Sequence, residues 1–390
     1  MALLILNAGS SSLKFSLLDQ HDHHVWLQRT IDLKSGERDN AAVNAAVNRI
    51  VAESRAIAPT APMTPMTPVT PVGGRIAAIE AVVHRVVHGG TRFTQPVRIT
   101  PEVRAALSEL TPIAPLHNPP SLDVIDAAMK VLPDVPHVAV FDTAFHATLS
   151  PEARTYPLPY DWSERWGLRR FGFHGLSHAY GARRAAEMLG RSPDGLHVVV
   201  AHLGNGASIT AVKDGASIDT TMGFTPMEGL MMGTRSGSID PGLLLYLQRA
   251  HGLTADELDH ALNHESGLLG VSGLSSDMRT LSAAAAGGDR RASLAIGIFA
   301  HRARQAIGAL AVTLGRVDAL VFTGGIGEHS VEMRTVICEG LSCVGLELDQ
   351  GANSSKLPDA VLSSSRSPGQ ILVVTSREDI TMARAAMSCV

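Results

Sequence analysis

Two short stretches place small, amide and hydroxyl residues between apolar runs. They are LILNAGSSSLKFSLL (residues 4–18) and VVVAHLGNGASITAV (residues 198–212). Glycine lets the backbone approach a ligand closely, and consecutive N–H groups beside serine hydroxyls form a nest that binds an anion. Either turn alone is more typical of a plain hairpin. Two such turns in one chain favour the binding of a chain of phosphates.

A third glycine-rich stretch, VFTGGIGEHS (residues 321–330), has a different layout. An apolar strand runs into Gly324-Gly325-Ile326-Gly327, and we expect a helix to begin near Glu328. This order of elements is typical of a loop that holds phosphate groups at the N-terminus of a helix. The alternative is a tight connection that needs glycine for its own sake. Three glycines in four residues favour contact with a ligand.

Charged residues follow several apolar runs. Arg85 comes directly after VVH, Asp142 after VAVF, and Arg235 lies in the loop GTRSGSIDP. A buried arginine is costly unless it pairs with a carboxylate or binds an anion, so these residues predict either structural ion pairs or anion sites. His174 and His178 are spaced i, i+4, but no HExxH pattern accompanies them. We therefore expect histidines that form hydrogen bonds, with a metal site as the alternative.

The pattern of apolar and polar residues predicts alternating strands and helices. Residues 3–6, 13–18 and 24–31 are expected to form an antiparallel meander, with HDHH (21–24) at a hairpin tip. The segment 58–74 holds five prolines, which favour an extended surface insertion rather than a partner-binding polyproline segment. Further strands are expected in 79–88, 137–143, 196–204, 208–215, 318–322 and 371–376, and helices in 40–55, 119–132, 290–315, 328–340 and 378–388, with another starting at Thr100-Pro101.

The two turns at Asn7 and Asn205 lie about half a chain apart, which suggests an internal duplication. Two similar α/β halves would then face each other across a cleft, each offering a turn of backbone N–H groups. We expect a first domain of 1–145 with about 381–390, and a second domain of 146–380.

Composition excludes several classes of protein. The net charge of −4 provides no basic footprint for nucleic acid or anionic lipid. No apolar run reaches the roughly 18 residues of a transmembrane helix, and no basic region leads into an apolar one as in a signal peptide. The three cysteines, Cys338, Cys343 and Cys389, are poorly spaced for zinc. We expect a cytoplasmic protein with reduced thiols that contacts neither membrane nor nucleic acid.

Together the motifs resemble the acetate kinase family, in order and over nearly the whole chain, from residue 4 to about 384. They are LILNAGSSSLKFSLL, HRVVHGG, PLHNPP, FDTAFH, RRFGFHGLSH, HLGNGASI, MGFTPMEGLMMGTRSGSIDP, GVSGLSSDMR and FTGGIGEHS. The resemblance implies the duplicated ribonuclease H-like fold of acetate and sugar kinases, Hsp70 and actin, with the active-site cleft between the halves. It implies reversible in-line transfer of a phosphoryl group from ATP to acetate, giving acetyl phosphate and ADP. It also implies Mg²⁺, with Mn²⁺ as its substitute, and a homodimer.

The resemblance further implies roles for individual residues. The predicted catalytic residues are Arg85, His117, Asp142, His174 and Arg235. The acetate pocket would comprise Arg85, Val87, Leu116, Phe173 and Pro226. The nucleotide would contact Lys14, His202, Leu203, Gly204, Asn205, Gly206, Asp277, Met278, Arg279, Gly325, Ile326 and Gly327. Asn7 and Glu378 would hold Mg²⁺, directly or through water, which suits a hard cation that keeps much of its hydration.

Two other interpretations stay open. A propionate kinase of the same family is the first, because one methylene in an apolar pocket discriminates by only about 1–3 kcal/mol; Val87, rather than a smaller residue, favours acetate. The second is a nucleotide-binding protein of the actin-like superfamily without catalytic activity. A protein that only binds a nucleotide needs no second arginine to hold another anion. The presence of both Arg85 and Arg235, the two candidate anion clamps, therefore argues against this second interpretation.

Arg235→Lys tests the anion-clamp interpretation. The substitution keeps the positive charge but removes the planar fork that matches phosphoryl and carboxylate oxygens. We expect turnover to fall at least about a hundredfold, with a nearly unchanged melting temperature. Steady-state kinetics and thermal melts measure the two effects. Near-normal turnover would reduce Arg235 to a structural residue.

Overall fold

The computed structural model describes residues 2–9, 12–19, 24–32, 40–57 and 79–390. The chain divides into two compact units, Met1–Ala144 with Arg377–Val390, and Phe145–Ser376. The second boundary differs from the expected division at 380/381, because the helix that begins at Glu378 packs against strands of the first unit. The proline-rich segment 58–74, the serines at 10 and 11, and most of HDHH lie outside the described residues.

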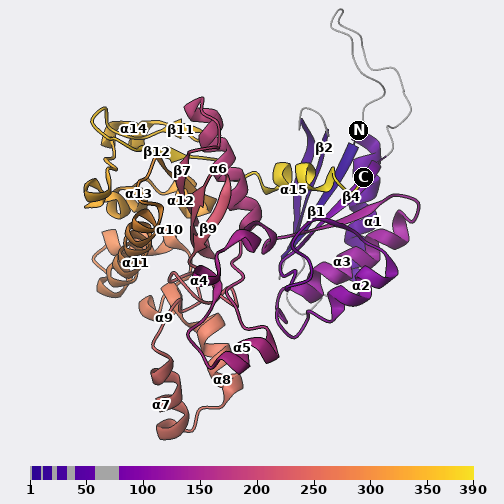
Figure 1. Ribbon diagram of the computed structural model, residues 1–390, viewed down its shortest axis with the longest axis horizontal. Coiled ribbons are helices and arrows are strands. Elements are labelled where there is room, and N and C mark those ends of the chain that lie inside the picture. Colours follow the sequence, from indigo (N-terminus) through magenta and orange to yellow (C-terminus); the bar gives the residue numbers. More distant parts are fainter. Residues whose placement is uncertain (1, 10–11, 20–23, 33–39, 58–78) are drawn as a thin grey trace, which may run out of the picture. The chain divides into compact units, whose positions relative to one another are not determined.

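The first unit is built on a six-stranded sheet in the order β3-β2-β1-β4-β6-β5 (Figure 1). The first three strands form the predicted antiparallel meander, while β1, β4 and β6 run parallel at the centre. Central parallel strands are buried on both faces, which explains their continuous apolar runs. The strand bounds are β1 Ala2–Ala8, β2 Ser12–Asp19, β3 Val25–Asp32, β4 Ile79–Val86, β5 Val97–Arg98 and β6 His137–Phe141.

Helices cover both faces of this sheet. Leu4 and Leu6 of β1 pack in one core with α1 and α3. Side chains alternate along a strand, so Leu3 and Ile5 face the opposite side, where α15 packs against β1, β4 and β6. Thr100 caps α2 as predicted, accepting a hydrogen bond from the N–H of Val103. The helix bounds are α1 Asn40–Ile57, α2 Pro101–Ser108, α3 Asn118–Val131 and α15 Glu378–Ala386.

The second unit repeats the same plan. Its sheet has the order β11-β12-β10-β7-β8-β9, in which β7, β8 and β9 form an antiparallel meander and β7, β10 and β12 run parallel. The predicted duplication of α/β halves is therefore confirmed. The strand bounds are β7 His197–Leu203, β8 Ala207–Lys213, β9 Ala216–Thr220, β10 Ala319–Thr323, β11 Ala360–Val361 and β12 Gln370–Val373.

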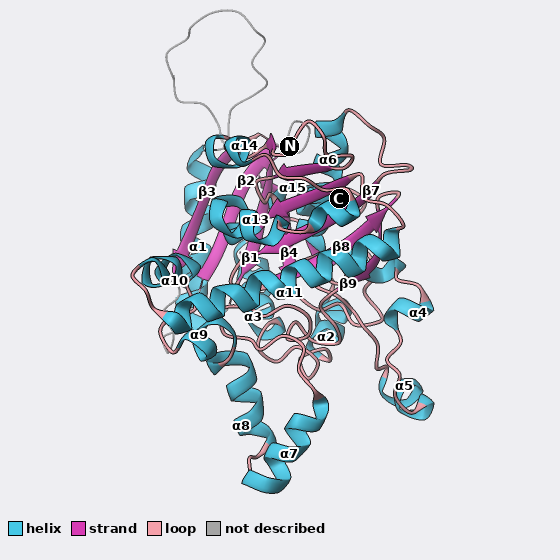
Figure 2. Cartoon of the chain, turned by 90° about the vertical axis from the view of Figure 1, so that its left-hand side faces the viewer, coloured by secondary structure: helices cyan, strands magenta, loops and turns pink. Residues whose placement is uncertain are grey.

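Two long helices pack on this second sheet. Helix α6 lies against β7 and β10, where Gly181 approaches Val200 and Val321, and α11 lies across β8 (Figure 2). Shorter helices surround them. The bounds are α4 Pro151–Arg154, α5 Tyr160–Trp166, α6 Gly175–Leu189, α7 Pro241–His251, α8 Ala255–His260, α9 Gly267–Ser272, α10 Met278–Ala286, α11 Arg290–Leu314, α12 Gly324–His329, α13 Val331–Cys338 and α14 Gln350–Ser355.

The repeat corrects one comparison made from the sequence. Asn7 is not in the turn but lies within β1, opposite Lys14 of β2. The equivalent pair in the second unit is His202 opposite Ser208, so the counterpart of Asn7 is His202 and not Asn205. Because small residues follow Asn7, the sequence predicts that the strand ends at residue 6, two positions before its observed end at Ala8.

The helix expected at 328–340 is also wrong in its bounds. Helix α12 begins at Gly324, whose N–H is capped by the side chain of Glu328 at 2.9 Å. Gly324 adopts φ +78°, which favours glycine at this junction of strand and helix. The helix ends at Ser330, which is extended and whose hydroxyl caps α13 through the N–H of Met333. The glycines of the GGIG motif therefore form the first turn of a helix.

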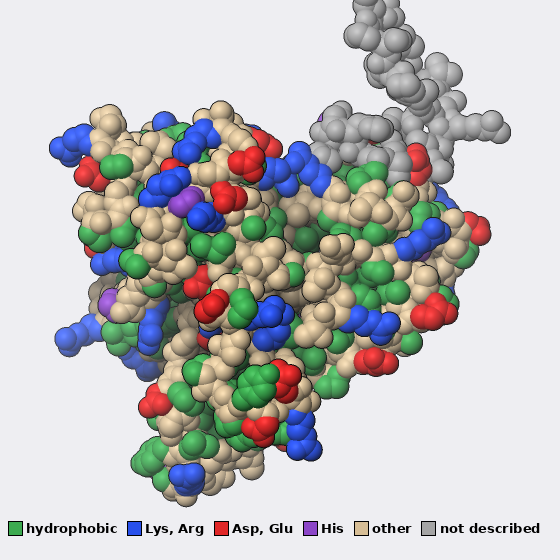
Figure 3. All heavy atoms as spheres, viewed as in Figure 1, with side chains coloured by type: hydrophobic (Ala, Val, Ile, Leu, Met, Phe, Trp, Pro, Cys, Tyr) green, Lys and Arg blue, Asp and Glu red, His purple; other side chains and the backbone are tan. Residues whose placement is uncertain are grey.

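Within the described part of the chain, no helix is long and apolar enough to cross a membrane. Figure 3 shows basic and acidic side chains interspersed on the visible face rather than gathered by sign. This distribution agrees with the balanced composition. All three cysteines are free thiols.

Arg334 is the largest fully buried side chain among those described, and it ties α12 to the rest of the second unit. Its guanidinium donates to the carbonyls of Gly327 and Glu328 at 2.9 and 2.8 Å, and to Asn353 Oδ1 at 2.7 Å. These carbonyls are the unpaired C-terminal groups of α12. Arg334 therefore donates hydrogen bonds to the C-terminal carbonyls of the helix whose first turn holds the GGIG motif.

Arg334→Met should destabilise the protein by about 3 kcal/mol, because it leaves several buried oxygens without a donor. Urea unfolding measures the change. Arg249→Met, on the exposed face of α7, is the matched control and should have almost no effect. A loss below about 1 kcal/mol in Arg334→Met would show that water replaces the guanidinium without penalty.

Candidate active site

Polar residues meet at the carboxyl ends of three neighbouring strands in the first unit. Asn7 lies near the end of β1, Arg85 near the end of β4, and Asp142 directly after β6. These strands are parallel and adjacent, so their carboxyl ends share one edge of the sheet. Glu378, at the start of α15, and Lys14, opposite Asn7, complete a group that we call the Arg85 cluster.

Arg85 is the centre of this cluster. Its Nε donates to Asp142 Oδ1 at 3.1 Å, its Nη2 to Asp142 Oδ2, and its Nη1 to Asn7 Oδ1 at 3.0 Å. Burial by itself would lower the pKa of Arg85, but Asp142 and Glu378 raise that pKa above its ordinary value. The fork is thus held in one orientation by two side chains from two other strands.

Glu378 is a partly buried carboxylate beside this pair. Its Oε2 accepts from Asn7 Nδ2 at 3.3 Å. Burial raises the pKa of Glu378, with Asp142 and Asp379 adding to the rise and Arg85 and Lys14 opposing it. A positive group placed beside Glu378 would relieve this cost.

Two predicted pocket residues, Val87 and Leu116, and the predicted catalytic residue His117 lie in two segments that hydrogen bonds join near the end of β4. Val87 is buried, and the amide of Asn118 makes two hydrogen bonds of 3.1 Å to the backbone of the neighbouring His88. These bonds bring Leu116 and His117, which directly precede Asn118, beside Val87. Leu116 is 43% exposed, so an apolar side chain remains open to a ligand.

In the second unit, the two predicted nucleotide turns are adjacent. His202 of β7 pairs with Thr323 of β10, so both strands end at the same level. A Cβ atom on Gly204 would lie 3.9 Å from the N–H nitrogen of Gly325, and one on Gly324 would lie 2.8 Å from the carbonyl oxygen of Leu203. At Gly324, only glycine permits this approach. The two turns form one surface of backbone groups.

His174 and Arg235 converge on the same turn. A Cβ atom on Gly206 would lie 3.3 Å from His174 Nε2 and 3.8 Å from Arg235 Nη1. Arg235 Nη1 donates to the carbonyl of Pro226 at 3.2 Å, and burial lowers the pKa of Arg235. The rings of His174 and His202 lie 4.4 Å apart between centroids. We call these residues, with Gly206 and Pro226, the His174 cluster.

His174 itself has an unusual backbone. Its φ is +56°, in the left-handed region that is uncommon for residues other than glycine, although histidine is one of the types enriched there. The preceding Gly172 has φ +73°, and a Cβ atom there would lie 2.6 Å from the ring of His146. Nε2 of that buried ring forms a hydrogen bond of 3.0 Å with the carbonyl of Phe173. Burial lowers the pKa of His146 to about 4. A neutral His146 therefore fixes the turn that presents Phe173 and His174.

Asp277, Met278 and Arg279 occupy a separate element. Asp277 caps α10 and accepts from Arg279 Nη2 at 2.6 Å, while the Arg279 side chain is 91% exposed. The hydrogen bonds of Asp277, chiefly from Arg279, lower its pKa to about 2. The described contacts of this pair are local, so its link to the glycine turns stays a prediction.

Comparison with known proteins identifies the family of this chain. Residues 2–384 match the model of the acetokinase family. The chain belongs to the acetokinase family. It is 47% identical to an acetate kinase of Microcystis aeruginosa over 98% of both chains. It is 38% identical to a crystal structure of Porphyromonas gingivalis acetate kinase, with a TM-score of 0.86 over 99% of each chain. A propionate kinase structure from Francisella tularensis is 35% identical, with a TM-score of 0.86 over 98% of each chain.

Membership of this family makes the protein a phosphotransferase with a carboxyl group as acceptor, of the fold that acetate and sugar kinases share with Hsp70 and actin. The family uses ATP and ADP. The roles assigned to single residues are not tested by these similarities. They rest on the geometry described above and are argued further below.

Sequence reasoning missed the residues that support the acetokinase loop 220–228. Arg170 Nη1 donates to the carbonyls of Thr220, Thr221 and Met222, each at 3.1 Å, and Nη2 donates to Glu228 at 2.8 Å. The hydroxyl of Tyr156 donates to Glu228 and accepts from the N–H of Phe224. Arg170 and Glu228 lie within the quoted motifs, but nothing in their spacing reveals that they meet.

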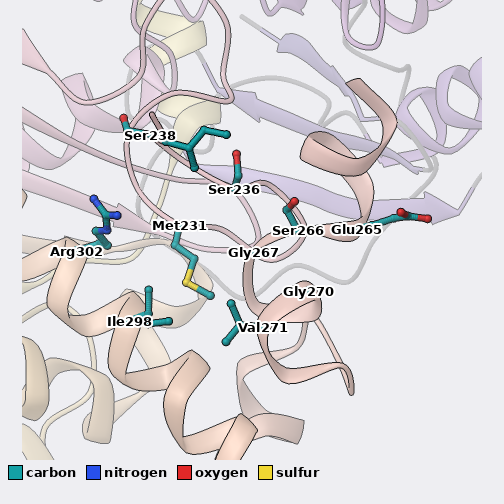
Figure 4. Close-up of a pocket in the computed structure, with 11 residues that line it drawn as sticks. Met231, Ser236, Ser238, Glu265, Ser266, Gly267, Gly270, Val271, Ile298 and Arg302 are labelled. Carbon is teal, nitrogen blue, oxygen red and sulfur yellow. The ribbon is translucent and has the colours of Figure 1, made fainter. Parts of the chain in front are cut away.

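A pocket of about 420 Å³ lies behind the loop that carries Arg235 (Figure 4). Gly267 lies in its wall with φ +62°, and a Cβ atom there would come within 2.7 Å of the Arg235 carbonyl oxygen. None of the predicted substrate or nucleotide residues lines this pocket. Its lining residues are Met231, Ser236, Ser238, Ile239, Glu265, Ser266, Gly267, Gly270, Val271, Ile298 and Arg302.

Gly206→Ala tests whether the space between His174 and Arg235 is used. The backbone of Gly206 does not need glycine, but the new methyl group would occupy the gap that both side chains face. We expect turnover to fall at least about tenfold, because a small displacement of aligned groups is costly. Thermal melts should be nearly unchanged. Gly297→Ala, on α11 with open space around it, is the control, and equal turnover in both variants would contradict the prediction.

Proposed function

We propose that the protein catalyses reversible, Mg²⁺-dependent transfer of the γ-phosphoryl group of ATP to acetate, giving acetyl phosphate and ADP by direct in-line displacement. The observation that carries the proposal is the convergence of His174 and Arg235 on Gly206, at the tip of a glycine turn suited to phosphates. A protein that only binds nucleotide needs no such pair of donors beside its phosphate turn.

Phosphoryl transfer leaves a protein little covalent chemistry to perform, so positioning and charge neutralisation dominate. Arg235 and Arg85 would neutralise the equatorial oxygens and the acetate carboxylate, using forks that match both. His174 would add a hydrogen-bond donor to the phosphoryl group. Asp142 would orient Arg85 through the paired contacts described above. Acetate is ionised at neutral pH, so no strong general base is required.

Backbone N–H groups would hold the nucleotide. The turn from His202 to Gly206 and the first turn of α12, including Gly325, Ile326 and Gly327, would cradle the phosphates, which the N-terminus of a helix favours. The segment Asp277–Arg279 would contact the adenosine. Lys14, exposed on β2, would add a positive charge on the phosphate side.

The donor set of the Arg85 cluster fits a magnesium ion. Glu378 offers a carboxylate and Asn7 an amide oxygen, and Mg²⁺ takes one or two such oxygen ligands together with phosphates and water. No group of three or more histidine, cysteine or acidic residues suited to a metal occurs among the described residues, so phosphate and water would supply the remaining ligands. The ion, when bound, would neutralise charge on the phosphates. A cation beside the partly buried Glu378 would oppose the rise in the pKa of this carboxyl that burial causes, and so would favour its ionised form.

Acetate is proposed over propionate on the strength of the apolar residues. Val87 and Phe173 are buried at 6% and 1% exposure, so their side chains have little freedom to make room for a further methylene. Overall fold does not decide, since an acetate kinase and a propionate kinase match the chain equally well. Leu116 and His117 would contact the acceptor from the first unit, and Pro226 from the second.

Trapping of the acyl phosphate with hydroxylamine tests the proposal directly. Purified protein with ATP and Mg²⁺ should form hydroxamate with acetate at least about tenfold more efficiently than with propionate, and least with butyrate. Chelation of Mg²⁺ should abolish the product in every case. Faster reaction with propionate would select the second candidate. ATP binding without hydroxamate from any acid would contradict a kinase function.

A further inference from the structure

One buried hydroxyl joins two histidines behind the His174 cluster. Ser208 of β8 is fully buried, and its Oγ lies 2.9 Å from His174 Nδ1 and 2.7 Å from His178 Nε2. His178 lies on the first turns of α6 and is also fully buried. Its other ring nitrogen, Nδ1, is buried and has no hydrogen-bond partner within the described part of the chain.

The hydroxyl has one proton and two lone pairs, so it can donate to one imidazole while it accepts from the other, or accept from both. Accepting from both would bury the Ser208 O–H without an acceptor among the described residues, because the two imidazoles are its hydrogen-bond partners there. Two arrangements are left. In the first arrangement, His178 Nε2–H donates to Ser208, and the Ser208 hydroxyl donates to His174 Nδ1. The proton of neutral His174 then sits on Nε2. In the second arrangement both bonds are reversed. His174 then carries its proton on Nδ1, and His178 carries its proton on the buried Nδ1.

The surroundings of His178 decide between the two. The second arrangement would bury an N–H donor without an acceptor, whereas the first leaves only an unprotonated nitrogen there. Orphaned buried N–H groups are rarer than under-used acceptors in native proteins, because the lost hydrogen bond is not recovered. A doubly protonated His178 is excluded as well, since burial, with His146 and His202 nearby, keeps its pKa well below the ordinary value.

We propose that His178 and Ser208 are positioning residues that fix His174 as the tautomer with its proton on Nε2. This nitrogen is the one that lies beside Gly206, near Arg235. His174 is thereby a hydrogen-bond donor toward the phosphoryl group and cannot present a lone pair, which would repel phosphate oxygens. The role of the relay in turnover rests on the proposed function, while the tautomer itself does not.

The arrangement also accounts for a feature that the reaction alone leaves unexplained. The equivalent of Ser208 in the first unit is Lys14, an exposed cation. In the second unit, the small hydroxyl at this position is the group that joins the two imidazoles.

Nitrogen-15 NMR of histidine-labelled protein, without substrate, reads the tautomers directly. We expect both His174 and His178 to be protonated on Nε2 only, with resonances assigned by comparison with His174→Gln and His178→Gln. In Ser208→Ala the ring of His174 should become a mixture of tautomers. Protonation of His174 on Nδ1 in the unmodified protein would overturn the proposal, whether or not the protein phosphorylates acetate.

Matched variants test the consequence for turnover. The amide nitrogen of glutamine can replace the Nε2 donor of histidine, whereas that of asparagine replaces Nδ1. His178→Gln should therefore keep turnover within about threefold, while His178→Asn and Ser208→Ala should each lower it by about tenfold to a hundredfold, at nearly constant KM. The double variant should be no worse than either single one, because both remove the same relay.

His197→Gln is the control, since His197 is likewise buried with an unpartnered Nδ1 among the described residues but lies at the opposite end of β7. It should leave turnover unchanged. Equal losses in the glutamine and asparagine variants of His178 would show a packing role and overturn the proposal. If His178→Asn does not fold, Ser208→Ala and the NMR measurement still decide. Correct tautomers in a protein that makes no hydroxamate would instead overturn the proposed function alone.

Discussion

The partly buried guanidinium of Arg85 imposes the strictest requirement on the first unit. A permanent charge in that position must be matched by acceptors with the right geometry, or the unit loses several kcal/mol. Asp142 and Asn7 meet the requirement from two different strands, one on each side of β4. The strand order β1-β4-β6 and its register are therefore tied to the chemistry at the strand ends, and a shift of one residue would separate all three side chains.

The second unit uses the same sheet for a different purpose. Its corresponding strand ends carry His202 and Thr323, neither of which is permanently charged. Glycines bring the two turns close enough to share a surface of N–H groups, and the cationic residue, Arg235, comes from a loop rather than from a strand. The duplication thus supplies two copies of a scaffold. The side chains at equivalent positions, such as Lys14 and Ser208, have diverged in charge and in burial.

Much of this could be predicted from the sequence, because strand ends are marked by abrupt changes from apolar to polar residues. The positions of Arg85 and Asp142 follow from such changes, as does the repeat of the sheet. The end of β1 was misjudged because Asn7 and Ala8 belong to the strand although their residue types favour a turn. The sequence predicts helix α12 too late in the chain because its first turn is rich in glycine, and the group that caps the N–H of Gly324 is the side chain of Glu328. Ser208 and Arg170 gave no signal at all, since their partners lie 30 or more residues away. The roles of the site residues remain predictions that rest on family resemblance and geometry.

The position of α15 in the chain has a consequence for how the protein is made. The second unit is one continuous segment, whereas the first unit is assembled from two segments with the second unit between them. During synthesis, Arg85 and Asp142 leave the ribosome more than 230 residues before Glu378 does. During that interval, one face of the sheet in the first unit lacks α15, whereas the second unit can fold as soon as it emerges. The nascent first unit therefore exposes the apolar residues of β1 and β4 that α15 later covers, and this is the stage at which a chaperone would have the most to protect.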